Sequence, residues 1–325
     1  MHIRNILRFV LLIGLGWLAS TGAAAQGYPA KPMRWLVPYP AGGGSDVIAR
    51  AIGAQLSINT GQPVLIENRP GGGTMIAAEA AAKSTPDGYT LLSADNGTLV
   101  FNTALYAKLP YDPQKDLAPV SLIARVPLLL VAHPSFPASD AKGFIELAKQ
   151  RPGVLNYGSP GAGSPHHLAM ELLKRATGTD VTHVPYKGAA PAVQDLMGGQ
   201  IPLMLLDTAV ALPQLRAGKI KALGALTPSR LASLPEVATM AEQGIAEVVA
   251  YAWIGVVVPA ATPREVVASL SSEIGRASQN AAVSAKLRDF GIETLASSPQ
   301  AMREYIESET KLWHALIKER AIRLD

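Results

Sequence analysis

Short apolar runs of strand length alternate with helical stretches along most of this chain, and this alternation limits the possible folds more than any other feature. Strands are expected at residues 34–38, 64–67, 89–94, 155–158, 182–184, 203–206 and 221–226. Helices are expected at residues 46–58, 141–150, 165–177, 189–197 and 209–217, with an alanine-rich helix ending at Lys83. Alternating strands and helices predict a parallel sheet covered on both faces, so we expect an α/β fold.

Two longer apolar runs, at residues 119–132 and 248–259, interrupt this alternation. The first contains Pro127, which cannot donate a hydrogen bond in the middle of a sheet, so this run suits a strand that passes from one sheet to another. If the second run returns the chain, two doubly wound lobes are joined by two crossover strands. The helices expected at residues 264–279, 281–290 and 299–319 then pack on the first lobe.

This topology predicts a discontinuous first domain, made of residues 26–124 and 253–325, and a second domain of residues 125–252. Ligands of such folds bind outside the carboxyl ends of the strands, where loops lead into helix N-termini. The loops at these ends are therefore the places to look for function.

Residues 1–25 are expected to be a secretory signal peptide. Arg4 and Arg8 precede an apolar run at residues 9–19, and small residues at 23–25 suit cleavage before Gln26. Eleven apolar residues are too few to span a hydrocarbon core of about 30 Å. We therefore expect a periplasmic protein.

Composition excludes several classes of function. The sequence has 0 cysteines, which excludes disulfides, thiol nucleophiles, iron–sulfur clusters and cysteine-bound zinc. Its net charge of +4 is small and spread along the chain, so no nucleic-acid partner is expected. No cofactor is expected either.

The loop between the first expected strand and helix, at residues 39–46, contains three consecutive glycines. Glycines let the main chain approach a ligand, and free N–H groups at a helix start attract an anion. The alternative is an ordinary turn in which Ser45 or Asp46 caps the helix.

Three further places repeat this pattern of strand, polar loop and helix. They are the glycine-containing loop at residues 159–164, the loop at residues 96–98, and Asp207 at the end of a strand. One anion site in each lobe, facing a shared cleft, would hold a small molecule with one or two carboxylates. For Asp207, a role as a helix N-cap is an equally good explanation.

The spacing of serines, glycines and histidines in the sequence does not match the standard motifs for catalysis or metal binding. The serines at 45, 159 and 164 lack a G-x-S-x-G context, and the first glycine loop lacks the dinucleotide fingerprint. His167 and Glu171 have a spacing that suits a metal, but two ligands are too few. We therefore expect no catalytic residues and no metal site.

Ordered blocks over nearly the whole mature chain resemble the Bug family of extracytoplasmic solute receptors, the TctC-type binding proteins of tripartite tricarboxylate transporters. These blocks lie at residues 28–32, 37–46, 67–71, 86–92, 109–113, 183–188, 195–200 and 217–219. They include the segments YPAKP, VPYPAGGGSD, ENRPG, PDGYTLL and HVPYKG. One departure is Tyr-Pro-Ala before the glycines, where many relatives have Phe-Ala-Pro.

The resemblance implies a type 2 periplasmic-binding-protein fold without catalysis. It implies a mono-, di- or tricarboxylate bound in an interdomain cleft and delivered to the membrane permease subunits of the transporter; we expect a monomer. Residues 41–45 and 96–98 would anchor the carboxylate, and the second lobe would set selectivity. The predicted ligand-binding residues are Tyr39, Ala41, Gly43, Gly44, Ser45, Asn96, Thr98, Ser159, Gly161, Gly163, Ser164, His167 and Asp207.

Two other functions share these sequence features. A periplasmic receptor that senses its ligand for a two-component kinase would have the same cleft. An exported hydrolase would need a nucleophile and a base, for which only Ser164 with His166 or His167 comes close.

Overall fold

The computed structural model describes residues 28–324, so the expected signal peptide at residues 1–25 lies outside the described residues. Residues Lys31–Asp325 form one unit, and the description below concerns this unit. The strands are β1 Met33–Val37, β2 Val64–Asn68, β3 Thr90–Asp95, β4 Leu117–Ala132, β5 Asn156–Ser159, β6 Thr182–Pro185, β7 Leu203–Asp207, β8 Lys221–Ala225, β9 Tyr251–Pro259 and β10 Glu293–Thr294.

The α-helices are α2 Gly44–Thr60, α3 Met75–Ala82, α4 Asn102–Leu105, α5 Ala141–Gln150, α6 Pro165–Thr177, α7 Ala189–Met197, α8 Thr208–Arg216, α9 Arg264–Ser278, α10 Ala281–Asp289 and α11 Pro299–Glu319. A short 3-10 helix, η1 Gly72–Thr74, precedes α3, and a π-helical turn, η2 Gly97–Phe101, precedes α4. The ranges of α5, α6, α7 and α11 match the sequence prediction.

Caps explain why several helices begin where the sequence predicts. Ser164 accepts a hydrogen bond from the main chain of His167 at the start of α6, and Pro165 occupies its first turn. Asp140 caps α5 in the same way, through a bond from the N–H of Gly143. These polar residues precede amphipathic stretches, which is the pattern that identifies a helix start.

The strands form a mixed sheet with two parallel regions. β1 lies between β2 and β3 and is parallel to both, while β5 lies between β6 and β7 and is parallel to both. The parallel arrangement expected from the alternation is therefore confirmed for these strands. The two long strands differ, since β9 is antiparallel to β3 and β4, and β4 is also antiparallel to β7 and β8.

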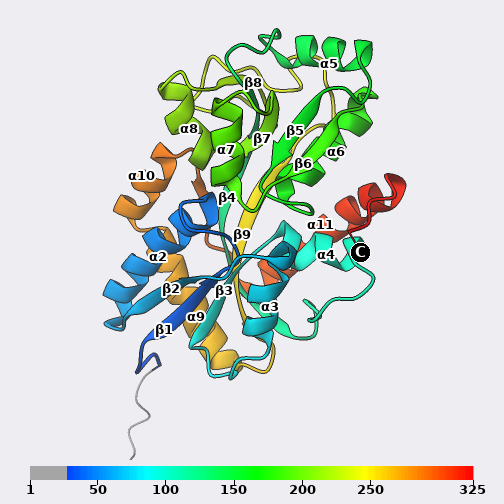
Figure 1. The fold of residues 1–325 in the computed structure, drawn as a ribbon. Coiled ribbons are helices and arrows are strands. Elements are labelled where there is room, and N and C mark those ends of the chain that lie inside the picture. Colours follow the sequence, from blue (N-terminus) through cyan, green and yellow to red (C-terminus); the bar gives the residue numbers. More distant parts are fainter. Residues whose placement is uncertain (1–27, 325) are drawn as a thin grey trace, which may run out of the picture. The chain divides into compact units, whose positions relative to one another are not determined.

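Strand β4 crosses from one region to the other, as the sequence predicts for the apolar run with the proline. Its first part pairs with β9 as far as Pro127, opposite Tyr251. From Leu128, opposite Asp207, it pairs with β7. Figure 1 shows β4 and β9 running side by side between the group β1–β3 and the group β5–β8. The exact domain boundaries at 124/125 and 252/253 stay a prediction.

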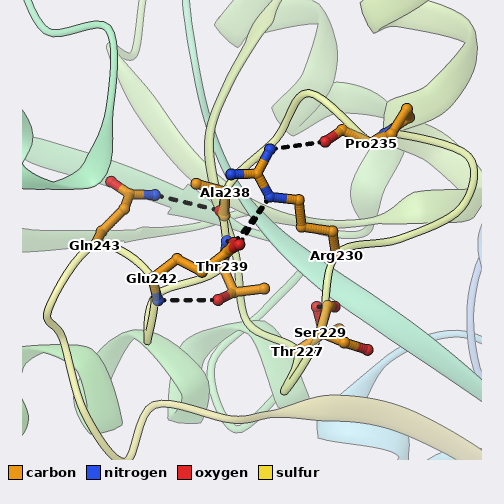
Figure 2. A network of polar contacts seen from close by, with 8 residues as sticks. All are labelled: Thr227, Ser229, Arg230, Pro235, Ala238, Thr239, Glu242 and Gln243. Carbon is orange, nitrogen blue, oxygen red and sulfur yellow. Dashed lines mark hydrogen bonds and ion pairs between the residues drawn. The ribbon is translucent and has the colours of Figure 1, made fainter.

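The connection between β8 and β9 contains no long element and is ordered by polar contacts (Figure 2). Thr239 and Glu242 form a reciprocal pair, in which each main-chain N–H donates to the other side chain, at 2.8 and 3.1 Å. Arg230 donates to both carboxylate oxygens of Glu242, at 2.9 and 3.0 Å. The buried Gln243 donates to the carbonyl of Leu223 in β8. This return segment is therefore fixed to the sheet that it leaves.

The core lies on both sides of the central strands. Every residue of β3 and of β7 is buried, as expected for central strands with helices on both faces. Trp35 on β1 and Trp253 on β9 are fully buried and are among the largest core side chains. In the part of the chain that the structure describes, no helix has the length and apolar character needed to cross a bilayer.

Candidate functional site

A cavity of about 70 Å³ lies at the carboxyl ends of the parallel strands, where ligands of such folds bind. It is bounded by loops that follow β1, β3, β5 and β7, and by the middle of β4 and β9. The lining residues are Tyr39, Pro40, Ala41, Gly43, Gly44, Ser45, Asp95, Val126, Pro160, Pro165, His166, Ala189, Ala190, Asp207, Ala252 and Ile254. Both strand groups therefore contribute to one cavity, as expected for a fold with this topology.

The start of α2 points its main chain at this cavity. Gly43 is the N-cap residue of α2 and makes no side-chain cap bond. Neither Ser45 nor Asp46 caps the helix, so the alternative of an ordinary capped turn is wrong. The Asp46 carboxylate instead accepts hydrogen bonds from the N–H of Gly42, which precedes the helix, at 3.0 Å and from Arg50, one turn later, at 2.9 Å. The first N–H groups of α2 consequently remain available for an anion.

The loop shape depends on the buried carboxylate of Asp46. Burial alone would raise its pKa, but hydrogen bonds from Arg50, Gly42 and Asn68 lower the pKa below its usual value. Gly42 has a φ of 86°, in the region that favours glycine. The Asp46 carboxylate and the left-handed conformation of Gly42 together fix the main chain at this turn of the loop.

Tyr39 and Asp95 meet at the edge of the cavity. The Tyr39 hydroxyl donates to Asp95 Oδ2 at 2.6 Å, while the N–H and hydroxyl of Thr98 donate to Oδ1 at 2.9 and 2.8 Å. Burial, and then the charge of Asp95, raise the pKa of Tyr39 well above its ordinary value. The phenol therefore stays protonated and remains a donor at neutral pH.

Asp207 closes the cavity from the opposite strand group. Its Oδ1 accepts from the N–H of Val210 at 3.2 Å, so the carboxylate caps α8, and its Oδ2 lies 3.3 Å from Nε2 of His166. A Cβ built on Gly44 would lie 3.1 Å from Asp207 Oδ1. The helix-cap role considered from the sequence is present, and the same carboxylate also lines the cavity.

Six of the predicted binding residues line this cavity, namely Tyr39, Ala41, Gly43, Gly44, Ser45 and Asp207. Gly161, Gly163 and Ser164 line a neighbouring cavity, which also includes Tyr39 and the residues 70–74. Asp95 and His166 line the first cavity although they are not among the predicted binding residues. Asp95 directly follows the strand expected at residues 89–94, and an acidic residue in that position is a signal by which the sequence could identify it.

The other predicted residues, and the hydroxyl of Ser164, make contacts inside the protein. Asn96 is fully buried, and its Oδ1 accepts from the N–H of Trp253 at 3.0 Å. Thr98 is bound to Asp95, as described above. Ser159 is fully buried, with its hydroxyl 2.6 Å from Nε2 of His183. Ser164 caps α6 through the N–H of His167, so its hydroxyl acts in the helix cap.

His167 and His183 form a stacked pair of rings. Their ring centroids are 4.1 Å apart with an interplanar angle of 8°. Nδ1 of His167 accepts from the N–H of Gly163 at 3.1 Å. Burial, followed by the charge of Lys174, lowers the pKa of His167 to about 4. Burial and then His167 lower the pKa of His183 to about 3.

This pair predicts a loss of stability in acid. Unfolded histidine has a pKa of about 6.5, so the unfolded chain binds protons more readily than the folded one. Stability is therefore complete above about pH 6.5 and should fall as the pH drops towards the folded pKa values of about 4 and about 3. Thermal unfolding between pH 7 and 4 should show a steeper decline for the wild type than for His183→Phe, which keeps a stacking ring. Parallel curves for the two proteins would contradict this explanation.

Comparison with known proteins identifies the family. The profile of the family described as "Tripartite tricarboxylate transporter family receptor" matches residues 48–322. The chain is 36% identical over 325 residues to Protein BugT of Bordetella pertussis, covering 98% of this chain and 99% of that protein. It is also 35% identical over 320 residues to a UPF0065 protein of a Pseudomonas species, covering 97% and 95% of the two chains.

Solved structures show the same fold. A structure described as "R. palustris Rpa4515 with adipate" has a TM-score of 0.88 and 37% sequence identity, and the match covers 91% of this chain and 100% of that one. MatC from Rhodopseudomonas palustris, described with bound malate, has a TM-score of 0.84 and 34% sequence identity, and the match covers 89% of this chain and 100% of MatC. The periplasmic binding protein BugD has a TM-score of 0.86 and 29% identity, covering 91% and 100%. Its sequence and its fold together make this chain a member of the tripartite tricarboxylate transporter receptor family, the Bug or TctC-type solute-binding proteins.

Proposed function

We propose that this protein is a periplasmic receptor that captures a small carboxylate in the cavity between the two strand groups and delivers it to a tripartite tricarboxylate-type permease. The observation that carries this proposal is the uncapped start of α2, whose main chain lines the cavity. Free N–H groups and the positive end of the helix dipole favour an anion there. The relatives described with adipate and with malate support a carboxylate as the ligand.

Binding without chemistry is sufficient for this role. Hydrogen bonds to a charged group contribute about 1.5 to 3 kcal/mol each. Three or four of them support a dissociation constant on the order of micromolar, about 8 kcal/mol, after the losses of association. The solute would enter from the solvent, meet the N–H groups of Gly43 to Ser45, and be enclosed by Asp207 and the start of α6.

Calorimetric titration of the mature protein with a panel of mono-, di- and tricarboxylates tests the proposal. At least one carboxylate should bind with a dissociation constant on the order of micromolar. A strain that lacks the receptor should lose uptake of that labelled carboxylate, and the protein recovered from the periplasm should begin at Gln26. Failure of every carboxylate to bind would overturn the proposed function, whereas binding without an uptake defect would overturn delivery to a transporter.

A further inference from the structure

The cavity is acidic although the proposed ligand is an acid. Asp95 and Asp207 both line it and are 5% and 6% exposed. No lysine or arginine is among the described residues that line it. A buried carboxylate is costly unless it is paired or well hydrogen-bonded, so the partners of each one decide what the cavity can accept.

Asp95 has only uncharged partners. Its three donors are the hydroxyl of Tyr39 and the N–H and hydroxyl of Thr98. Hydrogen bonds from neutral donors hold the carboxylate in place but do not neutralise its charge. The charges of Asp95 and Asp207 both raise the pKa of the Tyr39 hydroxyl, so both carboxylates lie near this phenol although they come from opposite strand groups.

Asp207 lies beside the expected anion site. A Cβ on Gly44, in the first turn of α2, would be 3.1 Å from Asp207 Oδ1. A ligand carboxylate bound to the N–H groups of this turn would therefore lie close to a protein carboxylate. Like charges at short range in a site shielded from water repel one another strongly, unless a positive charge lies between them.

His166 gives an independent indication of a ligand. His166 is 7% exposed and lines the cavity; its Nε2 faces Asp207 Oδ2 at 3.3 Å, but its Nδ1 has no partner among the described residues. Buried polar atoms in native proteins are nearly always bonded, so an unpartnered Nδ1 in a cavity wall is expected to bind what fills the cavity.

We infer that the solute carries a protonated amine next to its carboxylate, as in an amino acid. Its carboxylate binds the main chain at Gly43 to Ser45, and its ammonium binds Asp95 and Asp207 with His166 at their side. This inference rests on the proposed function and narrows its ligand class. A dicarboxylate would add two negative charges to a cavity that already holds two carboxylates, whereas an amino acid supplies the missing positive charge.

Matched pairs that differ only in the amine test this inference. Calorimetry of the mature protein compares L-aspartate with succinate, L-glutamate with glutarate, and L-2-aminoadipate with adipate. In at least one pair the amine-bearing member should bind at least about tenfold more tightly, because an ammonium–carboxylate contact is charge-assisted. Equal or tighter binding of the plain dicarboxylate in every pair would overturn the inference and leave the proposed function standing. Failure of all probes, with failure of the wider carboxylate panel, would overturn both.

A neutral variant of Asp95 provides a second test of the inference. Asp95→Asn keeps the acceptor oxygen for Thr98, offers the Tyr39 hydroxyl an amide N–H donor in place of an acceptor, and removes the charge, so the preference for the amine-bearing member should fall at least about fivefold. Asp140→Asn is the matched control, since Asp140 caps α5 and is not among the lining residues. The control should keep the wild-type preference. An unchanged preference in Asp95→Asn, with wild-type unfolding temperature, would contradict the assignment of Asp95 to the amine.

Discussion

Replacement of Gly43 by leucine should weaken solute binding by at least about 100-fold, while the unfolding temperature stays within about 2 °C of the wild type. Gly43 has φ −81° and ψ 169°, which any residue adopts. A Cβ at this position would meet only the carbonyl oxygen of Pro40, at 3.8 Å. The larger side chain therefore fits the backbone, but it fills the cavity and covers the N–H groups of the first turn of α2.

Two smaller substitutions control this result. Gly43→Ala adds one methyl group in open space and should weaken binding less than Gly43→Leu. Gly275→Ala, in α9, places its methyl in ordinary contact with Ala296, at 3.6 Å, and should leave binding unchanged. Calorimetry with the tightest-binding carboxylate, together with thermal unfolding, measures both quantities. Wild-type affinity in Gly43→Leu would exclude the first loop from the site.

Replacement of Trp253 by alanine should lower the free energy of unfolding by about 3 to 5 kcal/mol. The indole is fully buried, and its N–H donates to Glu309 in α11 at 2.8 Å. It also packs edge-on against Tyr305, with the ring centroids 5.5 Å apart. The substitution leaves a large void and removes a donor from a carboxylate, and both effects act in the same direction.

Urea unfolding followed by circular dichroism measures this change without depending on tryptophan fluorescence. Trp253→Phe keeps an aromatic ring in the core and loses the bond to Glu309, so its destabilisation should be smaller than that of the alanine variant. A loss below about 1 kcal/mol in Trp253→Ala would show that the surroundings collapse into the void. Since Ala252 and Ile254 line the cavity and strand side chains alternate, Trp253 supports the cavity floor from behind.

The sequence predicts most of the secondary structure because the hydrophobic period changes clearly between strands and helices. The ranges of α6 and α7 follow from a cap or a glycine before an amphipathic stretch. The two-residue strand β10 has no such pattern and pairs with β4 only through tertiary contact. Antiparallel pairing of β4 and β9 likewise depends on where distant segments meet.

The site is predicted less completely, because the sequence does not show which way a side chain points from its helix or how deeply it is buried. His166 and His167 are neighbours on α6, and neighbouring helical side chains point about 100° apart. His166 lines the cavity, whereas His167 stacks on His183 inside the protein. Sequence spacing alone does not fix which of the two faces the cavity. Asn96 is similarly turned inward, where it holds the main chain of β9.

Pro127 has a consequence for the elasticity of the protein. It ends the ladder between β4 and β9, and the ladder between β4 and β7 begins at the next residue. A proline donates no hydrogen bond, so bending at this point breaks no ladder bond donated by residue 127. We therefore expect β4 to bend readily at this residue. Val126, one residue earlier, lines the cavity, so a solute bound there would touch the strand one residue before the proline.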